Sequence, residues 1–163
     1  MCGIVGWTDF TRDLSKETEI LKKMADTLAN RGPDDSGYWF CREAALGHRR
    51  LTVVDPEGGG QPMVRTAGNA EFVIVYNGEL YNTEDIRREL LPKGYIFKGW
   101  SDTEVLLNSY IEWGEDCVDK LNGIYAFAVW DARRKELFLA RDRIGVKPCS
   151  TAERAVPFSL LRK

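Results

Sequence analysis

The chain has 163 residues, of which 44% are hydrophobic and 29% charged, a composition typical of one globular domain and not of a disordered chain. Its formal net charge of −2, with no basic run, argues against nucleic acid as a partner, because phosphates would meet no positively charged surface. The sequence has neither the run of about 20 apolar residues that spans a bilayer nor a secretory signal, so we expect a cytoplasmic protein with no membrane partner.

The first predicted element is a strand over residues 2–7, and it begins with a cysteine. Removal of Met1 would leave a thiol and a free α-amine together on Cys2. A thiol attacks a carbonyl carbon once a base has taken its proton, and an α-amine, with an ordinary pKa of about 7.7–8, can serve as that base. A cysteine in a buried first strand is the structural alternative, and residues 2–7 alone favour it.

A helix and two strands are predicted next. Apolar residues recur every three or four positions over residues 20–28, which indicates one buried helix face. Gly32 and Pro33 are expected to end this helix, with Gly32 as a left-handed cap. Residues 36–41 and 44–54 are typical of strands.

The second of these strands carries His48, the one histidine of the chain. A multi-histidine metal site is therefore excluded, and we expect His48 to be structural rather than catalytic. The four cysteines contain no Cys-x-x-Cys pair, so the sequence predicts neither a metal site nor a disulfide framework. We interpret Cys41, Cys117 and Cys149 as ordinary core or surface residues.

The rest of the chain continues this mixture of strands and helices. The glycines at 58–60 precede Gln61 and Pro62 and not a helix with Lys-Ser/Thr, so we interpret them as a turn and not as a phosphate loop. The order of elements lacks regular βαβ alternation, which predicts an α+β layered domain with largely antiparallel sheets. A strand is predicted over 71–76, followed by a helix that begins at Thr83 and is closed by Pro92–Gly94. A further helix begins with a capping box at Ser101–Glu104 and ends near Trp113. The last predicted element is a hairpin of strands 125–131 and 136–141.

Three polar clusters lie at the ends of predicted elements, and each has a structural alternative. Asn77 and Gly78 are first of all a turn signal, although an amide beside an unhindered N–H could also stabilise an oxyanion. Arg49 and Arg50 are neighbours in a strand, so only one of them can face a given cleft. Asp102 could simply favour the dipole of its helix.

Several segments together resemble a known family. In order along the chain, they are similar to the motifs of the glutaminase domain of class II glutamine amidotransferases, and most of all to its asparagine synthetase branch. The resemblance covers residues 2–148. The segments are CGIVG at 2–6, RGPD at 31–34, HRRLTVVD at 48–55, QP at 61–62, YNGELYN at 76–82, SDTE at 101–104, GIYAFAVWD at 123–131 and ARDRIGVKP at 140–148.

The resemblance implies an N-terminal nucleophile hydrolase with a four-layer αββα sandwich. Cys2 matches the nucleophile, freed by removal of the initiator methionine, with its own α-amine as base. Asn77 and Gly78 match the oxyanion hole. Arg50 matches the residue that binds the α-carboxylate of glutamine, and Asp102 the residue that receives its α-ammonium. The substrate pocket is completed by Glu79 and the backbone of Leu51, Thr52, Val53 and Val54.

The implied reaction hydrolyses the side-chain amide of glutamine through a Cys2 thioester, and this half needs no metal or organic cofactor. ATP and magnesium are expected only in a synthetase domain, whose Ser-Gly-Gly-x-Asp-Ser loop does not occur in this chain. The expected partners are therefore glutamine and a synthetase domain or subunit that accepts the ammonia for asparagine biosynthesis.

The end of the chain departs from the family pattern. We expect a glutaminase domain over residues 2–148 and an atypical tail over 149–163, because the aromatic-rich strand that follows Gly-Val-Lys-Pro in the family is not found here. This departure predicts that the closing strands of the sandwich are truncated. Two other readings stay open: a non-catalytic remnant that binds glutamine or a partner protein, and a glutaminase of the purine or glucosamine pathway.

Overall fold

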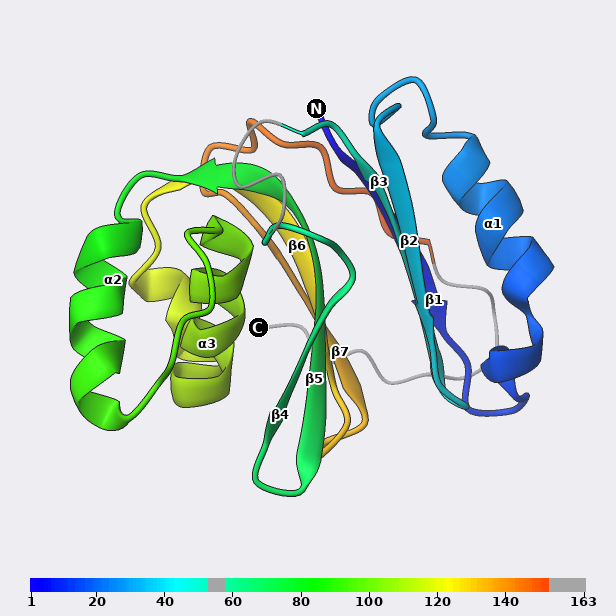
Figure 1. The fold of residues 1–163 in the computed structure, drawn as a ribbon. Coiled ribbons are helices and arrows are strands. Elements are labelled where there is room, and N and C mark those ends of the chain that lie inside the picture. The colour runs from blue at the N-terminus through cyan, green and yellow to red at the C-terminus, as the bar shows by residue number, and fades with distance from the viewer. Residues whose placement is uncertain (53–57, 153–163) are drawn as a thin grey trace.

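Two antiparallel sheets stack face to face in the computed structural model, which describes residues 1–52 and 58–152, and helices cover both outer faces (Figure 1). The predicted four-layer αββα arrangement is confirmed. One sheet has the order β1 (Gly3–Thr8), β3 (Ala44–Arg50), β2 (Asp35–Phe40); the other has the order β4 (Met63–Ala67), β5 (Ala70–Leu80), β6 (Gly123–Asp131), β7 (Glu136–Arg141). The helices are α1 (Thr18–Asp26), α2 (Thr83–Leu90) and α3 (Asp102–Trp113), with 3-10 turns η1 (Leu14–Lys16), η2 (Leu91–Lys93) and η3 (Gly114–Asp119).

Strand β6 shows how the sequence pattern produces the layers. Successive side chains of a strand point to opposite faces of the sheet, and both faces of β6 are apolar, so each face needs a cover. Phe127 and Val129 pack under α3 with Leu107 and Tyr110, whereas Trp130 faces the other sheet. The buried residues between the two sheets are Ala44, Leu46, Val73, Val75, Ala128 and Trp130.

Helix α1 covers the three-stranded sheet, but its ends and its face differ from the prediction. Leu21 and Ala25 are fully buried, as expected, whereas Ile20 is 41% exposed. The helix ends at Asp26 and has no left-handed cap at Gly32. Gly32 is needed for a different reason: a Cβ there would lie 2.3 Å from the carbonyl oxygen of Arg49.

Strand β5 is longer than predicted, and this corrects one interpretation. Asn77 and Gly78 form no turn; they continue β5 and pair with Ala126 and Tyr125 of β6. The strand predicted over 44–54 ends at Arg50, and its last two residues lie outside the described part of the chain. Strand β4 was not predicted.

The helix caps are confirmed in part. At the end of η2, Gly94 has a φ of +91°, so the left-handed stop is present. The side chain of Ser101 accepts a hydrogen bond from Thr103 N, which confirms the N-cap of α3. The capping box is wrong, because the Glu104 carboxylate instead accepts bonds from Lys98 N at 2.8 Å and Gly99 N at 3.0 Å.

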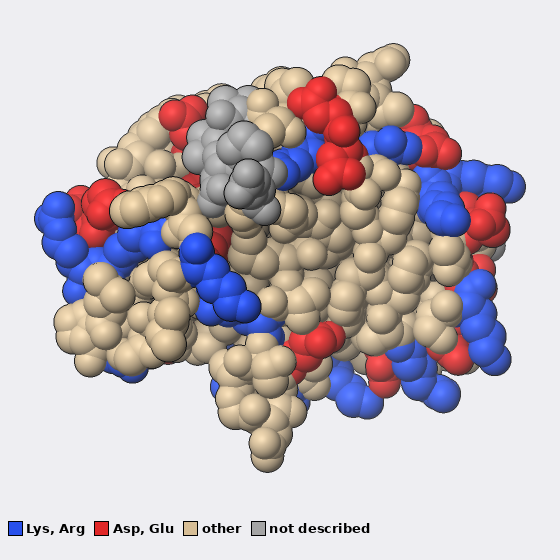
Figure 2. Space-filling view, in the orientation of Figure 1, with Lys and Arg blue, Asp and Glu red and all other residues tan. Residues whose placement is uncertain are grey.

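The surface of this fold is charged at its edges. Figure 2 shows uncharged side chains over the middle of the face in view, with Lys, Arg, Asp and Glu gathered around them. None of the helices in the described residues is long and apolar enough to cross a bilayer. The described chain forms no strand over residues 142–152, and the rest of the predicted tail lies outside it.

Candidate active site

Cys2 lies directly before β1, and its thiol is held by the chain that leaves β3. Leu51 N donates to Cys2 Sγ at 3.5 Å, and Cys2 Sγ lies 3.7 Å from Leu51 O. Arg31 Nε donates to the Cys2 carbonyl at 3.4 Å. The cysteine is only partly buried. A side chain in this position is fixed by its neighbours and still open to a substrate.

A pocket of about 230 Å³ opens beside Cys2. Asn77 of β5 lines the same pocket, so the predicted nucleophile and the predicted oxyanion donor lie together, although Cys2 precedes β1 of one sheet and Asn77 belongs to the other sheet. Arg31 lines it as well. The full lining is Cys2, Gly3, Ile4, Leu28, Arg31, Asn77, Pro148 and Ser150.

The backbone at Gly78 explains why a glycine follows Asn77. A Cβ at Gly78 would lie 2.4 Å from the carbonyl oxygen of Ile124 and 2.8 Å from the Cα of Tyr125, so no larger residue fits without moving β6. Asn77 itself is 6% exposed. The pairing of β5 with β6 therefore fixes the position of both residues.

Asp102 is the first residue of α3, and it is tied to β5. Its Oδ2 accepts a hydrogen bond from Tyr76 Oη at 2.7 Å and one from Leu80 N at 3.4 Å. Burial raises the pKa of this carboxyl above its usual value, although the two donors oppose the change. A positively charged ligand at Asp102 would offset the cost of the buried charge.

The phenol of Tyr76 marks where the predicted site residues meet. Burial and then the Asp102 carboxylate raise the pKa of Tyr76 far above its usual range. Glu79 and Cys2 raise the pKa of Tyr76 further, so all three groups lie within electrostatic reach of it. Cys2, from the first sheet, and Asp102, from an outer helix, therefore approach the same part of β5.

The other predicted substrate residues take different positions. Arg50 ends β3 and is 8% exposed, whereas Arg49 pairs with Asp26 of α1, so the two arginines do face different ways. Thr52 N donates to Asp34 Oδ2 at 2.7 Å, which fixes the backbone after β3. Glu79 is exposed in β5. Val53 and Val54 lie outside the described residues.

His48 joins the two sheets. Its Nε2 lies 3.2 Å from the carbonyl oxygen of Tyr76, and the side chain is 1% exposed. Burial lowers the pKa of His48 to about 4, so the ring is neutral at physiological pH and donates to Tyr76 O. This placement agrees with a structural position in β3.

The structure adds two residues to which the sequence assigned no role. Gln61 accepts a hydrogen bond from Tyr76 N at 2.6 Å and donates to Thr103 Oγ1 at 3.1 Å, so it joins β5 to α3. Arg31 borders the Cys2 pocket, and its Nη2 is buried with no hydrogen-bond partner within the described chain. Both lie in segments that resemble family motifs, and this resemblance was the only indication in the sequence that they belong near the site.

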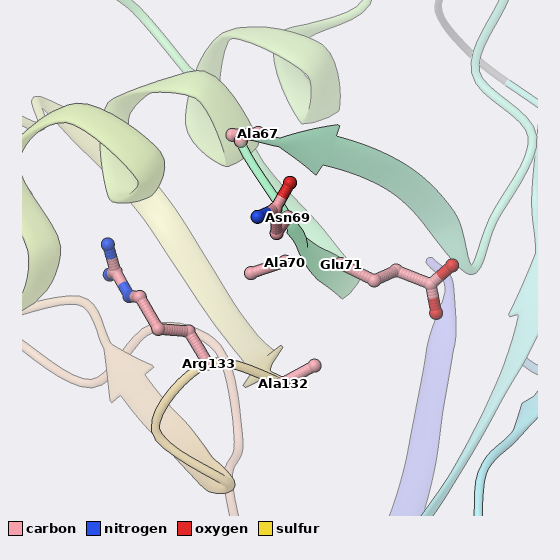
Figure 3. Close-up of a pocket in the computed structure, with 7 residues that line it drawn as sticks. Ala67, Asn69, Ala70, Glu71, Ala132 and Arg133 are labelled. Atoms are coloured by element: carbon pink, nitrogen blue, oxygen red, sulfur yellow. The ribbon is translucent and has the colours of Figure 1, made fainter.

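A second hollow lies away from this site, at the turns of the two hairpins (Figure 3). It has a volume of about 580 Å³, and Glu71 and Arg133 at its edge point away from each other. No cluster of three or more His, Cys, Asp or Glu that could hold a metal occurs within residues 1–52 and 58–152. The described residues that line the second hollow include no cysteine, whereas the Cys2 pocket holds a thiol beside the Asn77 amide, so the Cys2 pocket is the better candidate site.

Comparisons with known proteins identify the family to which the chain belongs. A family described as "Glutamine amidotransferase domain" matches residues 1–159. The chain is 60% identical over 148 residues to asparagine synthetase [glutamine-hydrolyzing] 3 of Bacillus subtilis, and this match covers 91% of the chain and 24% of the relative.

Two solved structures share the fold. One is titled as the structure of the allosteric regulatory enzyme of purine biosynthesis, with a TM-score of 0.56 and 28% identity. The other is glutamine phosphoribosylpyrophosphate amidotransferase from B. subtilis, with a TM-score of 0.55 and 27% identity. Each match covers 67% of this chain and 25% of that chain. The chain thus spans about a quarter of the length of these relatives.

Proposed function

The chain belongs to the glutamine amidotransferase domain family, and from this we propose that it hydrolyses the side-chain amide of glutamine, with Cys2 as the nucleophile. Its fold is the α+β sandwich of the N-terminal nucleophile amidotransferases. The observation that carries the proposal is that Cys2 and Asn77 line one pocket, which places a thiol beside an amide donor.

Glutamine would be held at both of its charged ends. The Arg50 guanidinium would bind the α-carboxylate, because its planar fork suits that group. Asp102 would receive the α-ammonium, which supplies the positive charge that its partly buried carboxylate lacks. Glu79 and the backbone of residues 51–54 would complete the pocket. A substrate held at two points has its side-chain amide fixed beside Cys2, which lowers the entropic part of the barrier.

The chemistry would then proceed in two steps. The neutral α-amine of mature Cys2 takes the proton of the thiol, and the thiolate attacks the side-chain carbon of glutamine. Asn77 and the N–H of Gly78 donate to the oxyanion that forms. The amine returns its proton to the leaving nitrogen, so ammonia departs and a γ-glutamyl thioester remains. Water then attacks the thioester and releases glutamate and the Cys2 thiol.

The ammonia acceptor is a second part of the proposal. The similarity to asparagine synthetases supports a synthetase domain or subunit as the partner, with asparagine as the product. ATP and magnesium would act in that half, and glutamine hydrolysis by this chain would need neither. We place the reaction in the cytoplasm.

The proposal is tested by replacing Cys2. We expect Cys2→Ala to lower glutamate release from glutamine to below about a thousandth of the parent rate, because the nucleophile is lost. The matched control is Cys41→Ala, which removes a different partly buried thiol and should leave the rate unchanged. Intact mass must first show that Met1 has been removed from all three proteins.

The outcomes separate glutamine hydrolysis from the non-catalytic binding function that the sequence leaves open. A thiol-directed glutamine analogue should label the parent once, at Cys2, and should not label Cys2→Ala. If the processed parent binds glutamine and releases no glutamate, the chain is a binding module and the catalytic proposal is wrong.

A further inference from the structure

The segment after β7 returns to the N-terminus. Figure 1 shows it, in orange, passing from the four-stranded sheet to the three-stranded sheet beside the first residues of the chain. Pro148 and Ser150 line the Cys2 pocket. Lys147 Nζ lies 3.5 Å from Met1 Sδ, although the two residues are 146 positions apart. An ammonium group thus lies at the residue whose removal creates the catalytic N-terminus.

Lys147 is held in this place by the sheet. Asp142 Oδ2 accepts a hydrogen bond from Lys147 N at 2.9 Å, and Oδ1 accepts one from Val146 N at 2.8 Å. Asp142 N donates in turn to Tyr125 O of β6 at 2.8 Å. Burial would raise the pKa of Asp142, but these backbone donors together outweigh it and hold the pKa below its usual value. The Asp142 carboxylate therefore accepts hydrogen bonds from backbone N–H groups and does not pair with the Lys147 ammonium.

The ammonium of Lys147 has no carboxylate partner within the described residues, where its one hydrogen-bond partner is Met1. The side chain is only 8% exposed. A buried charge is costly unless it is paired, so an unpaired lysine at this position needs an explanation other than an ion pair.

We propose that Lys147 is a positioning residue for Cys2: its fixed positive charge favours the neutral form of the Cys2 α-amine and the thiolate form of the side chain. The proposal rests on the proposed function, because it assumes a mature Cys2. Once Met1 is gone, the ammonium of Lys147 would lose the Met1 side chain that it contacts and could turn toward the new N-terminus. A like charge disfavours an α-ammonium, and an opposite charge favours a thiolate.

Of the other ionisable groups around Cys2, the carboxylates of Glu79 and Asp102 carry the opposite charge, and Arg31 and Arg50 stay in place in every variant of the test below. Arg31 Nε donates to the Cys2 carbonyl at 3.4 Å, so its positive charge also acts on Cys2. Arg50 precedes Leu51, whose backbone holds the thiol, and is proposed to bind substrate. Tyr76 is a neutral phenol, and burial keeps it so. Asp142 is held at the Lys147 backbone.

The test measures Cys2 reactivity without glutamine. The mature chain, with Lys147→Met and Lys147→Arg, is treated with iodoacetamide across a series of pH values, and the rate is read on the Cys2 peptide by mass spectrometry. We expect Lys147→Met to react about tenfold more slowly at neutral pH, with its profile moved to higher pH by about one unit. Lys147→Arg, which keeps the charge, should follow the parent.

Glutamine turnover gives the second readout. The acid limb of the rate profile should move to higher pH in Lys147→Met and stay in place in Lys147→Arg. If Lys147→Met does not fold, Lys147→Gln is read in the same way. Superimposed alkylation profiles of parent and charge-free variant would overturn the proposal. A parent that is mature and alkylated but releases no glutamate would instead overturn the proposed function.

Discussion

Asp102 shows how one residue can serve both the fold and a ligand. It accepts hydrogen bonds from Tyr76 and Leu80, so it joins α3 to β5, and burial raises its pKa. A carboxyl whose pKa is raised by folding adds stability at low pH and loses it as the pH rises through that pKa. At neutral pH the charged Asp102 therefore destabilises the empty protein, which is understandable if the charge is needed for a cationic ligand.

We predict that Asp102→Asn separates these two roles. The amide oxygen can still accept the hydrogen bond of Tyr76, and the buried charge is gone, so the free energy of unfolding at neutral pH should stay the same or rise. KM for glutamine should rise about 10- to 100-fold, because a charged hydrogen bond to the α-ammonium is lost. Chemical denaturation and steady-state kinetics measure the two effects.

The control for this substitution is Asp85→Asn on α2, which removes an exposed carboxylate from a pair with Arg88 and should change neither quantity. An unchanged KM in Asp102→Asn would show that Asp102 does not receive the substrate ammonium.

At the scale of elements, strands β3 and β5 of the two sheets are joined by a buried side chain, His48. The neutral ring of His48 donates to Tyr76 O and so joins the two sheets at the strand that carries Asn77. Protonation would place a buried positive charge between the layers, which burial strongly disfavours.

We therefore predict that acid weakens the fold through His48. The folded protein binds its proton near pH 4 and the unfolded chain near 6.5. The unfolded state binds more protons in this window, so stability is present above 6.5 and is lost as the pH falls toward 4. The loss due to His48 should approach about 3 kcal/mol, since each pKa unit corresponds to about 1.4 kcal/mol. Denaturant titrations across this window measure it.

Other carboxyls also titrate in this window, so the parent is compared with His48→Gln, which keeps an N–H donor and cannot be protonated. The variant should show a flatter dependence on pH. Parallel curves for the two proteins would mean that His48 does not contribute to the acid sensitivity.

At the scale of the whole molecule, the site is assembled from both ends of the described chain. Cys2 comes from the beginning, Asn77 from the middle, and Pro148 and Ser150 from the end. The last residue known to line the pocket is Ser150. Ser150 lies two residues beyond the domain boundary predicted at residue 148.

We predict that a chain ending at residue 152 keeps one cooperative unfolding transition and the parent rate of glutamine hydrolysis, because it contains every residue seen to line the pocket. A chain ending at residue 146 lacks Lys147 and this wall, and its rate should fall at least about tenfold. Thermal unfolding and glutamate release compare the three lengths. Loss of the cooperative transition at residue 152 would show that residues 153–163 belong to the folded domain.

Local patterns were sufficient for some of these elements. The alternation in β6, the stop at Gly94 and the cap at Ser101 all lie within a few residues of what they determine, and each is confirmed. The turn expected at Asn77 and Gly78 is wrong because pairing with β6 overrides the local preference. Gly32 was wrongly predicted to cap a helix. The contact that requires a glycine there is with Arg49, which is distant in sequence, so no local pattern shows it.

The same limit applies to the site. Family motifs identified Cys2 and Asn77, and the structure brings them to one pocket. No local pattern shows that Lys147 reaches Met1, because that contact depends on the path of the whole chain. Likewise, the hydrogen bonds that Gln61 makes with β5 and with α3 form only when β5, α3 and the segment that carries Gln61 pack together.

The exposure of the first residue has a practical consequence for preparing the enzyme. Met1 is 56% exposed while the rest of the fold is in place, so the residue that must be removed is accessible from solvent. An aminopeptidase could therefore mature the folded protein after purification. A purification tag fused before Met1 would block that trimming and extend from the rim of the pocket, so an affinity handle belongs at the opposite end of the polypeptide.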